Sequence, residues 1–140
     1  MNSNWIKWLL IFAAVWNLVG GATSLADPAR HFAQMYTVAP PADDALLKFF
    51  FLCTWINVLA WGGAYLLASL WPATRRAVLI AGGAGKTAYF LACAALVKSG
   101  VGQPLVLAFG LGDLAMAFLF GWAVLSQQRT ERYVPTWGRA

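Results

Sequence analysis

Four long apolar stretches alternate with short polar stretches along the chain. They cover roughly residues 5–21, 49–70, 77–97 and 105–125. A helix needs about 20 residues to cross the roughly 30 Å hydrocarbon core of a bilayer, where backbone groups must satisfy one another. The strands of a membrane barrel would be shorter and would alternate in polarity, which these stretches do not. The pattern therefore predicts an all-α integral membrane protein, a single domain over residues 1–140 with four transmembrane helices.

Two of the three connections are short and contain helix-breaking residues. Leu70-Trp71-Pro72 is expected to end the second helix, and Thr74 is expected to cap the third. Residues 98–104 form a tight turn that contains glycine. Short connections place neighbouring helices antiparallel, so we expect an antiparallel four-helix bundle.

The first connection, at about residues 23–45, is longer and has a helix of its own. Asp27 followed by Pro28 is a typical helix start, a capping residue and then a first-turn proline. The residues that would share one side of this helix are Phe32, Met35 and Tyr36. We therefore expect a short interfacial helix on the outer membrane surface, with an ordinary ordered loop as the alternative.

The end of this connection contains two prolines and two acids. Pro40-Pro41 is expected to end the interfacial helix, and Asp43 or Asp44 to cap the second transmembrane helix. His31, the single histidine, is expected to be a solvated loop residue without a role.

Composition strengthens the membrane interpretation. Of the 140 residues, 61% are apolar and 11% are charged, with eight Trp and nine Phe. A water-soluble fold of this size could not bury so much apolar surface. The net charge of +5 would suit a nucleic-acid partner in a soluble protein, but here the basic residues stand at the ends of apolar stretches. We therefore expect membrane lipids as partners and no nucleic acid.

The distribution of Lys and Arg predicts the orientation. With the N-terminus inside, the cytoplasmic side holds Lys7, Arg75, Arg76, Arg129, Arg132 and Arg139. The other side holds Arg30, Lys48 and Lys98. This bias predicts both termini in the cytoplasm (N-in/C-in). Residues 126–140 would form a cytoplasmic tail, with Tyr133 and Trp137 at the interface. The expected location is the cell membrane, or the inner membrane in a bacterium.

Several common kinds of site are not expected. Cys53 and Cys93 lie inside apolar stretches without metal-ligand spacing, so neither a disulfide framework, a metal nor another cofactor is predicted. Gly85-Lys86-Thr87 resembles the end of a phosphate-binding loop, but position 80 is Ile80 where that motif requires Gly.

Each predicted transmembrane helix carries one strongly polar residue in its interior. These residues are Asn17, Asn57, Lys86 and Asp113. At about 1.5 Å per residue, three of them lie roughly 18 Å from the cytoplasmic edge, and the Lys86 side chain can bridge its difference in depth. Ionisable groups inside a bilayer are costly, so we expect Lys86 and Asp113 to pair. Two interpretations stay open, a structural clamp and a polar pocket for a ligand, proton or ion.

Small residues accompany this polar set. They predict packing surfaces on the third helix, at Ala81, Gly85 and Tyr89 and at Ala84, Ala88 and Ala92, and on the fourth, at Ala117 and Gly121. Gly82, Gly83, Tyr89 and Phe90 lie within a turn of Lys86. Small and aromatic residues around a few polar groups indicate a cavity for a small lipophilic ligand, with ordinary helix packing as the alternative.

Short motifs in three helices resemble a known family. Trp16-Asn17, Gly85-Lys86, and Gly112-Asp113 followed by Ala117-Phe118-Leu119-Phe120 are similar to segments of small bacterial membrane proteins of the DoxX-like kind. The resemblance covers most of the chain and implies a four-helix membrane bundle. It assigns no substrate and no catalytic residue. The chain lacks the catalytic cysteines of membrane thiol oxidoreductases and the acidic residue of the first helix of small multidrug exporters.

Three functions remain open. The first is a protein that binds a lipophilic molecule such as a quinone or lipid, or an accessory subunit of a larger membrane complex. The second is a small proton-coupled transporter, working as a homodimer, that uses Lys86 and Asp113. The third is a membrane enzyme with Lys86, Asp113 or Tyr89 as acid or base, which is the least favoured because no complete catalytic set is visible.

Overall fold

A computed structural model describes residues 4–38 and 44–132, and 91% of these residues are helical. The helices are α1 (Asn4–Ala26), α2 (Pro28–Met35), α3 (Ala45–Leu70), the 3₁₀ turn η1 (Pro72–Thr74), α4 (Arg75–Lys98) and α5 (Pro104–Arg132). These two ranges contain no strand beyond an isolated bridge between Tyr36 and Gly102. The residues on which expectations were placed and that lie outside the described ranges are Pro40, Pro41, Asp43, Tyr133, Trp137 and Arg139.

Four of these helices, α1, α3, α4 and α5, are long and apolar enough to cross a membrane. This confirms the all-helical prediction, but each helix extends beyond the apolar stretch that revealed it. The largest difference is in α5, which continues to Arg132, whereas a polar tail was expected from residue 126. Residues 126–132 contain no Gly or Pro that would stop the helix, so hydropathy marked the end of the apolar surface rather than the end of the helix.

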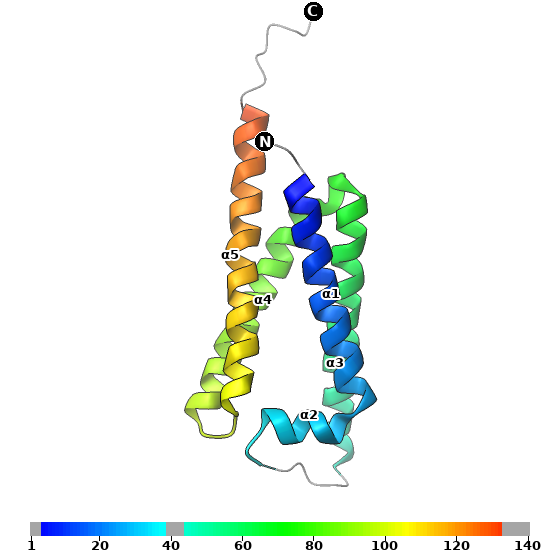
Figure 1. Cartoon of the computed structure of the whole chain (residues 1–140), viewed down its shortest axis with the longest axis vertical. Coiled ribbons are helices and arrows are strands. Elements are labelled where there is room, and N and C mark those ends of the chain that lie inside the picture. The colour runs from blue at the N-terminus through cyan, green and yellow to red at the C-terminus, as the bar shows by residue number, and fades with distance from the viewer. Residues whose placement is uncertain (1–3, 39–43, 133–140) are drawn as a thin grey trace, which may run out of the picture.

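The four long helices are arranged as two pairs. α1 lies along α3, and α4 lies along α5 (Figure 1). Glycines permit the close approach within each pair. A Cβ atom on Gly62 of α3 would lie 2.8 Å from Leu18 Cγ of α1, and one on Gly110 of α5 would lie 3.0 Å from Cys93 Cβ of α4.

The small-residue surfaces predicted for α4 do not form its packing face. The exposed residues include Ala81, Ala84, Gly85, Ala88 and Ala92. The buried face of α4 instead consists of Arg75, Leu79, Gly82, Lys86 and Cys93. Lys86 explains why α4 is turned this way about its axis. Facing a charged residue inward is favoured over placing it against lipid, and the alanine-rich side of α4 must then face outward.

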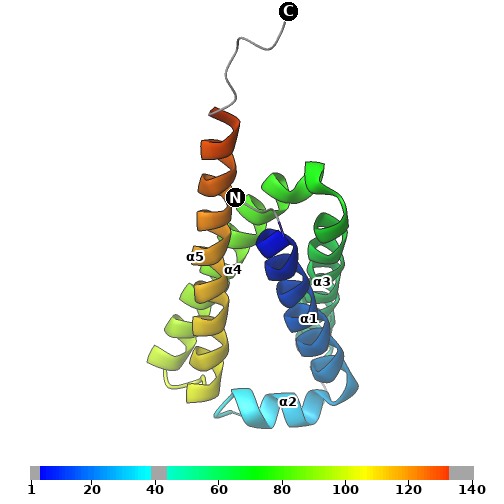
Figure 2. The ribbon, with the colours of Figure 1, turned by 45° about the horizontal axis from the view of Figure 1, so that its top comes forward.

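The short helix α2 lies across one end of the helix pairs (Figure 2). As predicted, Asp27 caps it, because the carboxylate accepts a hydrogen bond from the Arg30 amide (3.0 Å). The prediction of its end at Pro40-Pro41 was wrong, because the helix already stops at Met35. There the chain becomes extended and bonds to the α4–α5 turn: the Thr37 amide donates to the Val101 carbonyl (2.8 Å).

The N-terminal caps of α3 and α4 differ in how they match the sequence-based expectations. Asp44, one of the two acids expected to cap α3, does so by accepting a hydrogen bond from the Leu47 amide (2.9 Å). Thr74 precedes α4, but its hydroxyl donates to the Trp71 carbonyl (2.9 Å) and so does not cap α4. The hydroxyl is used by the 3₁₀ turn that separates α3 from α4.

Arg75 is buried and holds the end of α3. Its Nε donates to the Ala68 carbonyl (3.0 Å) and its Nη2 to the Ser69 carbonyl (2.8 Å). A cation suits the partial negative charge of a helix C-terminus, where carbonyls lack helical partners. Arg75, which was counted only among the basic residues that predict membrane orientation, therefore also has a structural role.

Candidate functional site

Lys86 and Asp113 form a buried ion pair in the interior of the helices. Lys86 Nζ lies 2.6 Å from Asp113 Oδ1, and the two side chains are 5% and 13% exposed. Lys86 Nζ also donates to Asn17 Oδ1 at 3.2 Å. The structure thus brings three of the five predicted site residues together. We refer to Asn17, Lys86 and Asp113 as the polar node.

The polar node connects the two helix pairs. Asn17 Nδ2 donates to the Val58 carbonyl of α3 (3.3 Å), while Asn17 Oδ1 accepts from Lys86 of α4. Lys86 in turn binds Asp113 of α5. The node therefore joins α1, α3, α4 and α5 through hydrogen bonds, and both functional groups of the Asn17 amide are used.

Aromatic side chains surround the polar node. Lys86 Nζ lies 5.7 Å from the centre of the Tyr65 ring, a cation–π distance. The Tyr65 ring packs against Phe120, and the Trp16 ring packs against Phe109, with centroids 5.5 Å and 5.8 Å apart. The burial of Lys86 and Asp113 lowers the local dielectric, which strengthens the ion pair and makes an unpaired charge there costly. The positions of Trp16, Tyr65, Phe109 and Phe120 in the sequence did not reveal that these rings surround the polar node.

Asn57 lies away from the polar node, whereas Tyr89 lies close enough to interact with the charge of Asp113 but does not join the hydrogen bonds of the node. Asn57 is exposed on α3, and Tyr89 is 42% exposed on α4. The inward face of α3 is set by Gly62, which lies five residues and about 140° around the helix from Asn57. The depth of a residue in the membrane follows from its position in the sequence, but the direction in which it faces depends on packing. Asn57 has the expected depth but does not face the polar node.

His31 is buried, contrary to the expectation of a solvated loop residue. It is 9% exposed, and its Nδ1 shares a hydrogen bond with Ser24 Oγ of α1 (3.1 Å). The rings around it are those of Phe32, Tyr36, Phe51 and Trp55, with centroids 4.9–6.1 Å away. Burial lowers the pKa of His31, because desolvation disfavours its charged form. The aromatic residues that flank the first connection were the available sign in the sequence that His31 is buried.

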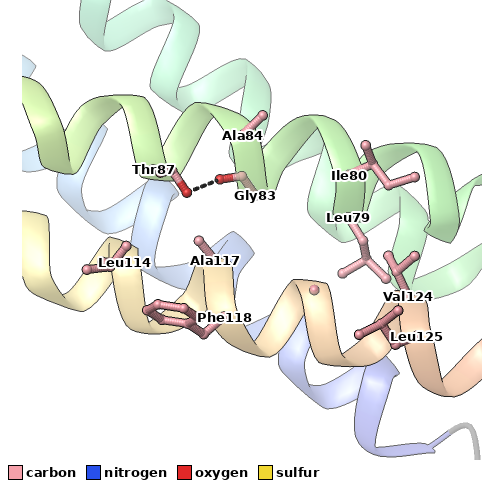
Figure 3. A pocket seen from close by; sticks show the side chains of 11 residues that line it. Leu79, Ile80, Gly83, Ala84, Thr87, Leu114, Ala117, Phe118, Val124 and Leu125 are labelled. Atoms are coloured by element: carbon pink, nitrogen blue, oxygen red, sulfur yellow. Dashed lines mark hydrogen bonds between the residues drawn. The ribbon is translucent and has the colours of Figure 1, made fainter.

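An apolar groove of about 470 Å³ runs between α4 and α5 (Figure 3). Its lining residues are Leu79, Ile80, Gly83, Ala84, Thr87, Leu114, Ala117, Phe118, Gly121, Val124 and Leu125. Thr87 supplies the single hydroxyl of this lining, and that hydroxyl donates to the Gly83 carbonyl (2.9 Å). The groove does not include Lys86 or Asp113, although it includes the residues that follow them, so it lies beside the polar node rather than around it.

Comparisons with protein-family models, curated proteins and solved structures found no match to this chain. The resemblance to DoxX-like proteins therefore stays an expectation. The polar node, the groove and the surfaces of the helices are the features that bear on function.

Proposed function

We propose that the protein is a multi-pass membrane protein that binds a small lipophilic molecule in the groove between α4 and α5, alone or as an accessory subunit of a membrane complex. The groove is the observation that supports this proposal. The excess of Lys and Arg on one side supports an antiparallel bundle in the cell membrane with both termini in the cytoplasm.

The lining of the groove indicates the class of ligand. A volume of about 470 Å³ falls within the range of small-molecule sites. The walls carry no charged side chain, and the Thr87 hydroxyl is already bonded. The part of the ligand that enters is therefore an apolar chain or ring, such as an acyl or isoprenoid chain. Because a ligand outside the groove would be dissolved in lipid, which is also apolar, close packing against small residues must provide the selectivity for the ligand.

Filling the groove tests this proposal. Gly121 lines the groove, and a Cβ atom added there meets nothing within 4 Å, so Gly121→Leu should fill the groove without disturbing the helices. Gly85→Leu is the matched control, because Gly85 is equally open and lies outside the groove. Native mass spectrometry of protein released from its own membranes in mild detergent measures the bound adduct.

We expect Gly121→Leu to lower adduct occupancy about tenfold, because a leucine side chain removes about 1.5 kcal/mol of apolar contact from the ligand. Gly85→Leu should leave occupancy unchanged. No adduct on the wild-type protein, or equal occupancy in both variants, would contradict the groove as the binding site.

The polar node favours a second candidate, a proton-coupled transporter. Buried ion pairs often add little stability over apolar packing, so a pair that also bonds to the other helix pair through Asn17 suits a switch. Transfer of a proton from Lys86 Nζ to Asp113 Oδ1 would leave both groups neutral and weaken the connection. Asp113→Asn should abolish proton uptake into dye-loaded liposomes. Thr54→Val, on the exposed side of α3, is the control, and uptake that persists in Asp113→Asn removes this candidate.

A further inference from the structure

Asn57 occupies the middle of α3 and faces away from the rest of the chain. It lies 12 residues after Ala45 and 13 before Leu70, and it is exposed. At about 1.5 Å per residue, the amide is roughly 18 Å from either end of the helix. In a membrane this position is the centre of the hydrocarbon core.

The Asn57 amide has no hydrogen-bond partner within the described part of the chain. Thr54, one turn away and also exposed, differs in this respect, because its hydroxyl donates to the Phe50 carbonyl (2.8 Å). An amide without a partner in an apolar medium is costly, and lipid tails offer neither donor nor acceptor. We therefore expect the Asn57 amide to form hydrogen bonds with a polar group of another molecule.

The surface around Asn57 is suited to another helix. Cys53, Asn57, Ala60 and Ala64 follow one another at spacings of four, three and four residues, which places them on one side of α3. Small residues at this spacing let a second backbone approach closely. Only 6% of the apolar stretch of α3 is buried, against 22–28% in the other long helices, so α3 has the most surface available for such contact.

We propose that this side of α3 binds the same side of α3 in a second copy of the chain, through reciprocal Asn57–Asn57 hydrogen bonds. Copies inserted into a membrane share one orientation, so a two-fold axis along the membrane normal brings Asn57 opposite itself. An amide is self-complementary, because Nδ2 of each copy can donate to Oδ1 of the other. This inference requires that α3 spans the membrane, but neither ligand binding nor proton coupling.

Dimerisation can be measured by energy transfer between labelled full-length copies in liposomes over a range of protein-to-lipid ratios. Asn57→Leu should weaken association about tenfold, because it removes the interhelical amide bonds. Asn57→Gln, which keeps an amide, should retain most of it. Thr54→Val is the matched control and should associate like the wild type, because its hydroxyl is already satisfied within α3. None of these exposed side chains supports the fold, so all variants should insert.

Cys53 offers an independent readout at the same surface. In the proposed dimer the two Cys53 thiols lie near the two-fold axis, so copper-phenanthroline and oxygen should oxidise them to an intermolecular disulfide in membranes. Cys93 is buried against Gly110 and serves as the internal control. A wild-type monomer at every ratio, unchanged association of Asn57→Leu, or cross-linking to a different protein in native membranes would overturn the proposal. Adducts and proton uptake in Asn57→Leu report separately on the proposed function.

Discussion

Asn17 and Lys86 are separated by 69 residues and meet at 3.2 Å, so that one amide connects the first helix pair to the charged centre of the second. Asn17 accepts from the ammonium group and donates to the Val58 carbonyl of its own pair. Hydrogen bonds inside a membrane are modest individually, but a network can contribute more than the separate bonds suggest. The stability of the polar node is therefore best measured by double-mutant analysis.

The ion pair should be strongly coupled. Lys86→Met leaves Asp113 without its cation, and Asp113→Asn leaves Lys86 without its anion. A lone charge at this depth costs about 2.5–3.5 kcal/mol, so each variant should lower the free energy of unfolding by about that amount. The double variant should lose about 1–3 kcal/mol less than the sum of the two. Reversible unfolding in mixed detergents measures all four proteins, and additive effects would show that the groups do not interact.

Adjacent glycines in α3 should respond oppositely to the same substitution. A Cβ atom on Gly62 would lie 2.8 Å from Leu18 Cγ and 3.3 Å from the Ala14 carbonyl oxygen, whereas one on Gly63 meets nothing within 4 Å. Gly62→Ala should lower the free energy of unfolding by about 1–3 kcal/mol by pushing α1 from α3. Gly63→Ala should raise it by about 0.5–1 kcal/mol through helix propensity. A similar response of both would contradict the close packing of this pair.

Stability at the α2 end should depend on pH through His31. Burial lowers its pKa in the folded state from about 6.5, so the unfolded chain binds a proton more readily than the folded chain does. The stabilisation is fully present above pH 6.5 and is lost as the pH falls, by at most about 1.4 kcal/mol per pH unit. Thermal unfolding between pH 8 and 5 measures this loss.

His31→Phe is the matched variant for that experiment. It keeps an aromatic ring among Phe32, Phe51 and Trp55 but has no group that titrates. The loss of stability below pH 6.5 should therefore shrink in this variant, and an identical pH profile would assign the effect to other groups.

The two adjacent arginines at the start of α4 should differ in importance. Arg75 is buried and binds the carbonyls of Ala68 and Ser69, whereas Arg76 is exposed. Arg75→Gln should lower the free energy of unfolding by about 1.5–3 kcal/mol, the usual worth of hydrogen bonds to a charged group. Arg76→Gln should change it by less than about 0.5 kcal/mol. Equal effects would show that charge near the membrane, rather than the helix-end contact, dominates.

Local signals predicted the helices well. Apolar stretches of sufficient length revealed all four long helices, and the acids Asp27 and Asp44 revealed two of the starts, because a capping carboxylate acts on amides two or three residues away. The pairing of Lys86 with Asp113 could be predicted from the free-energy cost of placing an unpaired charge in a membrane, since these are the two charged groups deep within the predicted spans.

Tertiary choices were not visible in the same way. The alanine-rich sides of α4 and the inward side of α3 depend on which neighbour each helix meets, and spacing alone allows several rotations. Asn57 therefore shared the depth of the polar node without sharing its direction. His31 was misjudged because its burial in α2 depends on α1 and α3 closing over it, and the aromatic residues that flank the first connection were only an indirect signal of this.

The bond between the Thr37 amide and the Val101 carbonyl has a consequence for how the protein is made. The two residues are 64 positions apart, with α3 and α4 between them. At 5–20 residues per second, a ribosome takes roughly 3–13 s to supply the partner that Thr37 needs. The α2 end therefore reaches its final state only after α4 has been synthesised, so its closure is a late event in folding rather than an early one.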